Sequence, residues 1–413
     1  MTMKRRQFLK GVGGATLTAG FYGAARSAAA AVAAGEPAAP FPFADDRIPM
    51  NAANLCPMPT AITEAVKRFG AELDVDMSGP NRGRIMAIKE EARSGIAAQL
   101  SVSPDEIAIV RNTSEANNIV VQGIDLNAGD EILLWDQNHP SNDVAWAVRA
   151  KRSGVSVRHL SVPVDANSED EVIDRIVAEV GAKTRVVSFT HISNVTGFRL
   201  PAEKICAALR RGHPDLYIHV DGAQTWGHVD ANLTDMDCDS FSGSAHKWYM
   251  GPREVGILYV RESSQDRVWP GVVSIPWGSD AEPSVAGARR FEALGQRDDA
   301  SIAALAETVR LHDELTPRGV EARSLEVSDL LRESLIDLDI PLVSSTNPLF
   351  RSSVIIISAP AANRGQLLQN LLDDGGIIAA TVNGLRLSPH VYNTAEHVER
   401  AANAVARSRD LLG

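Results

Sequence analysis

The sequence predicts an α/β fold, with a large domain built on a mostly parallel sheet and a smaller α+β domain at the C-terminus. Short β-branched runs alternate with helical patterns from Ala61 to Val260, as expected for a parallel sheet with crossover helices. Beyond Leu294, long helices surround one buried strand. The chain has 413 residues, enough for two or three domains at about 150 residues each. Its hydrophobic content of 44% suits a folded core.

Each strand and helix can be placed from these patterns. The predicted strands of the large domain are 107–110, 131–134, 155–160, 185–190, 216–220 and 256–260. The helices between them are predicted near 84–99, 115–124, 143–152, 169–179 and 201–211. The small domain is expected to contain long helices over 301–334, a strand over 354–358, a helix over 364–373 and a last helix from Thr394. We therefore predict an N-terminal arm (35–63) that packs with the small domain, a large domain (64–295) and a small domain (296–413).

The N-terminal 34 residues differ in charge from the rest of the chain. Overall, 41 Lys and Arg against 52 Asp and Glu give a net charge of −11, which argues against a nucleic-acid-binding protein. The first 34 residues have no acid, and Arg5 and Arg6 precede Phe8, Leu9 and an uncharged, alanine-rich stretch. This order is typical of a twin-arginine export signal, so we expect the twin-arginine translocase as a partner and a periplasmic location. The alternative is a basic tail on a cytoplasmic protein.

Two other classes of protein are disfavoured by the sequence. No run approaches the roughly 18 apolar residues that span a bilayer, which excludes a multi-spanning membrane protein. Cys56, Cys206 and Cys238 are odd in number and far apart, so neither a disulfide framework nor a metal site is indicated. We expect the three cysteines to be small buried hydrophobic residues.

An acid and a lysine stand out between residues 216 and 260. Asp221 follows a predicted buried strand, at the end where open α/β sheets bind ligands. Lys247 lies among small residues before a Gly-Pro turn, where a buried ammonium is unfavourable unless its pKa falls. Imine formation needs a lysine with such a lowered pKa. A solvated surface residue remains the ordinary interpretation of any single lysine.

Other residues could complete a site for pyridoxal phosphate (PLP). This cofactor needs an imine lysine, an acid at its pyridine nitrogen, donors for its phosphate and a flat group against its ring. The segment 111–118 opens a predicted helix, so its free N–H groups and the Ser114 hydroxyl could hold a phosphate. Ser244 and His246 precede Lys247 and could add phosphate contacts, and His139 could stack on the ring.

The motifs TSEANN, NHPSND, HISNVTG, HVDGAQ and SGSAHKW together resemble the signatures of the class V aminotransferase-type PLP enzymes of fold-type I. This group includes cysteine desulfurases and isopenicillin N epimerase, and the resemblance covers roughly residues 50 to 410. It implies PLP as cofactor, a homodimer, Lys247 as the imine lysine and Asp221 as the partner of the pyridine nitrogen. The other implied contacts are ring stacking by His139, ring-hydroxyl contacts by Asn194 and Gln224, phosphate contacts by Ser114, Glu115, Ser244 and His246, and a substrate-carboxylate contact by Arg386.

Three of these residues also have plain structural interpretations. His139 precedes Pro140 and could simply begin a helix, and Asn194 could hold a turn. Arg386 could form a structural ion pair between its leucine neighbours.

The resemblance also bears on the reaction. Desulfurases need a cysteine before the carboxylate-binding arginine, and 371–384 contains none, so sulfur abstraction is disfavoured. The segment 290–298 resembles the epimerase-like branch, in whose dimers it reaches the neighbour's cofactor phosphate, although Gln296 replaces a common hydroxyl residue. We expect an exported enzyme that transaminates or otherwise modifies an amino group of an amino acid or peptide-like metabolite, a siderophore-type compound being one candidate. The alternatives are an amino-acid epimerase and a non-catalytic exported binding protein.

Overall fold

A computed structural model describes residues 40–277, 285 and 287–413. The predicted export signal at 1–34 lies outside these residues. Within the described ranges, no helix combines the length and the apolar character needed to cross a membrane.

The large domain is built on a seven-stranded sheet with the strand order β2-β8-β7-β6-β5-β3-β4. Only β8 runs antiparallel to its neighbours in this sheet. Every strand predicted for this domain is present, with its ends within one residue of the predicted ones. Strand β7 was not predicted, because its SFSGS sequence lacks β-branched residues. The strands are β2 (Ile107–Val110), β3 (Glu131–Trp135), β4 (Ser156–Leu160), β5 (Thr184–Thr190), β6 (Tyr217–Asp221), β7 (Ser240–Ser244) and β8 (Gly256–Val260).

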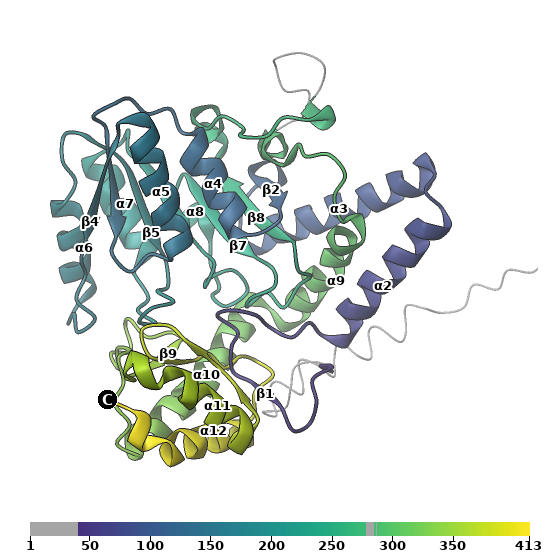
Figure 1. Ribbon diagram of the computed structural model, residues 1–413. Helices are drawn as coiled ribbons and strands as arrows, with labels where there is room; N and C mark the ends of the chain where they lie inside the picture. Colours follow the sequence, from purple (N-terminus) through teal and green to yellow (C-terminus); the bar gives the residue numbers. More distant parts are fainter. Residues whose placement is uncertain (1–39, 278–284, 286) are drawn as a thin grey trace, which may run out of the picture.

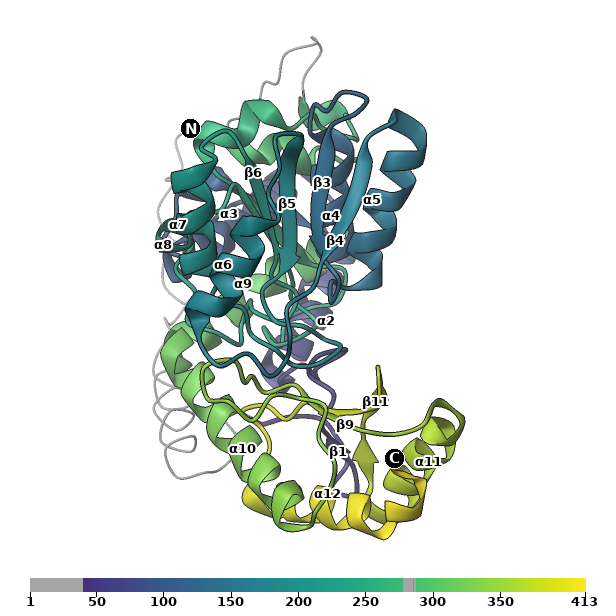
Figure 2. The same cartoon turned by 90° about the vertical axis from the view of Figure 1, so that its left-hand side faces the viewer.

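Helices cover both faces of this sheet (Figure 2). Side chains of α4 and α5, such as Val120 and Trp146, pack on one face. Residues such as Ile96 and Leu209 pack on the other face, which is covered by α3, α6, α7, α8 and α9. The bounds are α3 (Gly79–Gln99), α4 (Thr113–Gly123), α5 (Pro140–Ser153), α6 (Glu169–Ala178), α7 (Ala202–Gly212), α8 (Leu233–Met236) and α9 (Asp299–Leu315).

A break at Thr316 divides the two long helices that follow the predicted boundary at 295/296. Thr316 has a positive φ of 58° and precedes Pro317, so it separates α9 from α10 (Pro317–Asp337). Helix α9 packs on α3 and on α2 (Thr60–Val75), where its Ala303 and Ala304 meet Phe69. Because its apolar face is buried there, α9 belongs to the large domain.

The small domain lies below the large one in Figure 1. Helices α10, α11 (Arg364–Gly375) and α12 (Ala395–Arg407) share a core with a small antiparallel sheet. Its order is β11 (Ala380–Thr381), β12 (Leu385–Leu387) and β9 (Ile355–Ile357). The arm adds β1 (Ile48–Pro49), which pairs with β10 (Ile377–Ile378) and buries Ile48 in this core.

Candidate active site

The predicted site residues converge at the carboxyl ends of the parallel strands, on the side that faces the small domain. Asp221 ends β6 and Ser244 ends β7, while His139 follows β3 and Asn194 follows β5. Helix α4 begins directly after β2. In an open parallel sheet these ends form the ligand-binding edge. Arg386 lies in the middle of β12 and approaches this edge from the small domain.

The Lys247 side chain lies at the centre of this group. It is partly buried, and its ammonium forms no ion pair with any carboxylate of the described chain. Desolvation lowers the pKa of Lys247 from 10.5 to about 8; the charge of Asp221 opposes this effect and that of Arg386 adds to it. A substantial fraction of this amine is therefore neutral near physiological pH and able to act as a nucleophile.

Asp221 is held by donors alone. It is buried, its Oδ2 accepts a hydrogen bond from Asn117 Nδ2 at 2.8 Å, and its Oδ1 accepts one from the Ala223 N–H at 3.0 Å. Both carboxylate oxygens are acceptors here, which is the role that a pyridine N–H would need from this acid. Asn117 was not predicted as a site residue. It lies in the TSEANN motif, four residues after Thr113 and on the same buried face of α4.

His139 is both the N-cap of α5 and a half-buried ring in the site. Its Nδ1 accepts a hydrogen bond from the Ser141 N–H at 3.1 Å, so the proton of the neutral ring is on Nε2. Burial, and then the charge of Lys247, lower the pKa of His139 and keep it neutral. The capping role therefore coexists with the predicted stacking role, because it fixes the orientation of the ring.

At the N-terminus of α4, one of the first four N–H groups is left for a ligand. Thr113 donates to Ser244 Oγ at 2.8 Å, Glu115 to Asn112 Oδ1 at 3.0 Å, and Ala116 to the Asn112 carbonyl. The Ser114 N–H has no acceptor among the described residues, and the Ser114 side chain is exposed. A phosphate at this position would complete the helix terminus.

The side chains of Glu115 and Ser244, two of the other predicted phosphate contacts, are engaged within the protein, whereas His246 is engaged through its backbone carbonyl. The Glu115 carboxylate pairs with Arg111 at 2.9 Å, and the Ser244 hydroxyl bonds Thr113 Oγ1 at 2.7 Å. The His246 carbonyl accepts from the Cys56 N–H at 2.8 Å, and burial, aided by Lys247 and Arg253, lowers the pKa of His246 to about 4. These contacts shape the phosphate end of the site.

Of the two predicted contacts to the ring hydroxyl, one side chain has a free acceptor and the other is fully hydrogen-bonded within the protein. Asn194 is buried, and its Oδ1 has no hydrogen-bond partner in the described protein. Gln224 instead accepts from Trp248 Nε1 at 2.7 Å and donates to the Ala53 carbonyl at 3.0 Å. Asn194 therefore retains a free acceptor, while Gln224 fixes the residue that follows Lys247.

Arg386 is a buried cation that pairs with no carboxylate of the described residues. Its side chain is 4% exposed, its Nη2 donates to Asn51 Oδ1 at 3.3 Å, and its Nε has no partner in the described protein. Burial alone lowers its pKa to about 10. Since no carboxylate of the described residues pairs with it, the structural ion-pair interpretation is wrong. The site instead offers a two-pronged donor for a ligand carboxylate.

All three cysteines are buried and free. Cys56 nevertheless lies beside the lysine turn, through its backbone bond to His246. Its Sγ contacts the Tyr392 hydroxyl at 3.7 Å, and desolvation raises its pKa to about 12. The Cys56 thiol is therefore protonated and inert.

The residues present fit PLP. The lysine with a lowered pKa, the donor-held acid, the free N–H at α4 and the flat neutral His139 match its four requirements. The unpartnered atoms Asn194 Oδ1 and Arg386 Nε are buried polar groups that a ligand would satisfy.

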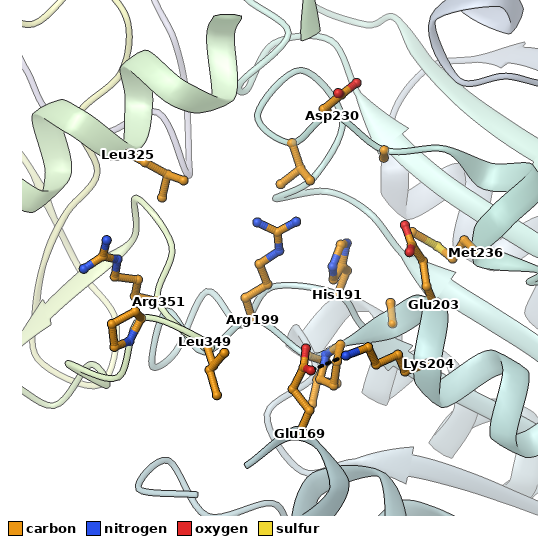
Figure 3. Close-up of a pocket in the computed structure, with 16 residues that line it drawn as sticks. Glu169, His191, Arg199, Glu203, Lys204, Asp230, Met236, Leu325, Leu349 and Arg351 are labelled. Atoms are coloured by element: carbon orange, nitrogen blue, oxygen red, sulfur yellow. Dashed lines mark hydrogen bonds and ion pairs between the residues drawn. The ribbon is translucent and has the colours of Figure 1, made fainter. Parts of the chain in front are cut away.

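A separate pocket of about 280 Å³ lies at the boundary of the two domains (Figure 3). Leu325 and Leu349 line it from the small-domain side, and Arg199 and Lys204 from the large domain. Its cations are already neutralised by Lys204–Glu169, Arg199–Glu321 at 2.6 Å and Arg351–Asp329 at 2.8 Å. None of the predicted site residues lines it.

Comparisons with known proteins agree with this geometry. The chain matches the aminotransferase class-V family over residues 59–401. It is 29% identical to isopenicillin N epimerase of Streptomyces clavuligerus, over 86% of this chain and 93% of that protein. Identity to the enzyme of the same name from Amycolatopsis lactamdurans is 32%, over 76% and 83%. A solved structure of a C-DES mutant with glycine covalently linked to PLP superposes with a TM-score of 0.82 at 25% identity, covering 89% of this chain and 98% of that one. This chain belongs to the aminotransferase class-V family.

Proposed function

We propose that this protein is an exported PLP-dependent enzyme that transaminates or otherwise modifies an amino group of an amino acid or a peptide-like metabolite. The observation that carries the proposal is that one site holds both Lys247, an amine with a lowered pKa, and Arg386, a buried cation with no counterion among the described residues. The first suits a covalent bond to PLP and the second suits a carboxylate on the substrate.

The residues divide the work as follows. PLP supplies an electron sink that makes the substrate α-proton acidic. Arg386 binds the substrate carboxylate and so orients the α-carbon toward Lys247. The Lys247 amine, when it is not bonded to the cofactor, would be placed to take up the α-proton. Asp221 would hold the pyridine nitrogen in its protonated form, and His139 would lie against the ring.

Sulfur transfer is disfavoured by the cysteines. The segment 371–384 contains no cysteine, and the Cys56 thiol beside the lysine turn has its pKa raised to about 12. A desulfurase needs a thiolate to attack sulfur.

Amino-acid epimerisation is the second candidate, favoured by the two isopenicillin N epimerases among the relatives. The two reactions share proton removal by Lys247 and differ in where a proton returns. Incubation with candidate amino acids and a siderophore precursor in deuterated water separates them. Modification is expected to give a keto or rearranged product. Stereoinversion with deuterium at the α-carbon and no keto product would instead establish the epimerase.

A non-catalytic exported binding protein is the third candidate. The purified enzyme should be yellow, and borohydride should remove the colour and label Lys247. A colourless protein that takes up no added PLP would defeat the proposed PLP enzyme.

We propose that the protein is exported to the periplasm by the twin-arginine translocase. Changing the arginine pair (Arg5→Lys with Arg6→Lys) should leave the protein in the cytoplasm, because that pair is the recognition element. Cell fractionation and the intact mass of the exported form measure this, with Lys4→Arg as the matched control. Unchanged export of the double variant, or an exported protein that keeps its first 34 residues, would contradict the proposal.

We propose a homodimer in which a second copy covers the phosphate end of the site. The exposed Ser114 opens onto a hollow that Val272 and Leu294 also line. Nearby in the chain, Trp269 is 69% and Ile275 is 92% exposed, an apolar surface that a partner would bury. Sedimentation should give twice the chain mass, and Ile275→Glu should shift the protein toward monomer with weaker PLP retention. A wild-type monomer that retains PLP would contradict this.

A further inference from the structure

Four polar side chains form a buried layer beneath α4, behind the cofactor acid. His219 and Asp221 lie two residues apart on β6 and therefore on one face of the sheet. They pair across the ladder with Ser240 and Ser242 of β7. Asn117 of α4 bridges this layer, and these side chains are at most 1% exposed. Each polar group in such a dry layer must find its partner inside the layer.

Only one assignment of donors and acceptors satisfies the hydrogen bonds of this layer. Asn117 Nδ2 donates to Asp221 Oδ2, so Asn117 Oδ1 must accept, and it accepts from Ser242 Oγ at 2.6 Å and from His219 Nε2 at 3.0 Å. His219 Nδ1 then accepts from Ser240 Oγ at 2.7 Å. Burial lowers the pKa of His219 to about 4, against the opposing charge of Asp221, so its ring carries a single N–H.

A rotated Asn117 amide would have the opposite effect on Asp221. Its oxygen would face the carboxylate, which would then have to become protonated to remain hydrogen-bonded. The two donors on Asn117 Oδ1 prevent this rotation. His219 supplies one of them, and its ring nitrogens bond Asn117 and Ser240 rather than Asp221 or Lys247.

We propose that His219 is a positioning residue that fixes the side-chain amide of Asn117 and thereby keeps the Asp221 carboxylate as the hydrogen-bond acceptor that would hold the pyridine nitrogen of PLP in its protonated form. This inference rests on the proposed cofactor. If it is correct, the protonation of the pyridine nitrogen depends on His219, which does not bind the cofactor but orients the Asn117 amide that bonds Asp221.

The test is nitrogen NMR of the protein loaded with PLP labelled with nitrogen-15 in its ring. Wild-type protein should show a protonated pyridine nitrogen. His219→Leu, which keeps the bulk and removes the donor, should shift the signal toward the neutral form and weaken PLP affinity about tenfold, the scale of one buried hydrogen bond. His219→Gln, whose amide can still donate, should restore both values.

Two further variants keep the test decisive. His312→Leu removes another buried neutral histidine, which bonds the Tyr249 carbonyl at 3.0 Å, and it should leave the nitrogen signal protonated. Ser242→Ala removes the second donor to Asn117 and should move the signal as His219→Leu does, even if His219→Leu fails to fold. An unchanged signal in His219→Leu, or in Ser242→Ala where His219→Leu cannot be purified, would overturn the proposal. Failure of the wild type to bind PLP would instead overturn the proposed function.

Discussion

Lys247→Ala should give a folded protein that holds no covalent PLP and loses activity by at least about 10³-fold. The lysine has two tasks in the proposed reaction, since it anchors the cofactor and moves the α-proton. No described acid pairs with its ammonium, so its loss leaves no carboxylate unpaired. Borohydride reduction followed by peptide mass spectrometry should label Lys247 in the wild type and no residue in the variant.

The rate at which the cofactor-free protein takes up PLP should depend on pH through the same amine. Only a neutral amine attacks the aldehyde, and desolvation lowers the pKa of Lys247 to about 8. The rate should therefore fall about tenfold for each pH unit below 8 and level off above it. A lysine with an ordinary pKa would still gain rate beyond pH 9.

Lys151, exposed in the last turn of α5, offers a matched control. Lys151→Ala should keep colour, label and activity. If Lys247→Ala remained yellow and carried the label on another lysine, the assignment of the imine lysine would be wrong.

The sequence was sufficient where a local pattern determines the structure. Strands such as β2 and β8 are regular apolar runs, and their predicted limits match. Strand β7 was missed because its small polar residues carry no periodic signal, although it brings Ser242 beside Asp221. Only tertiary packing shows that α9 buries its apolar face on α2 and α3 of the large domain.

In the candidate site, too, local motifs revealed some residues, while others are brought in only by tertiary contacts. The motifs located Lys247 and Asp221, because Asp221 follows a predicted strand and Lys247 lies among small residues before a Gly-Pro turn. Asn51 could not be found in this way, since it contacts Arg386 across 335 residues of sequence. The proximity of Cys56 to the lysine turn was hidden for the same reason, because the arm crosses from the small domain to the large one.

Arg386→Lys should reduce kcat/KM for an amino acid substrate by about 100-fold, roughly 3 kcal/mol, because a lysine cannot supply the two parallel hydrogen bonds of a guanidinium. The loss should fall mainly on KM, since the contact to the carboxylate is already made in the bound substrate. The corresponding amine that lacks the carboxylate should be handled equally by both proteins. Arg407→Lys, in the exposed last turn of α12, is the matched control and should change neither value.

Thermal unfolding separates this role from a structural one. Arg386 is 4% exposed and has no counterion among the described residues, so burying its charge lowers the free energy of unfolding of the ligand-free protein. Arg386→Met should therefore leave the unfolding midpoint of the ligand-free protein unchanged or raise it, while abolishing stabilisation by a bound carboxylate ligand. A structural arginine would behave in the opposite way, and a midpoint several degrees lower with unchanged substrate affinity would remove Arg386 from the site. The buried charge is retained at the expense of stability because the substrate, rather than the protein, supplies its partner.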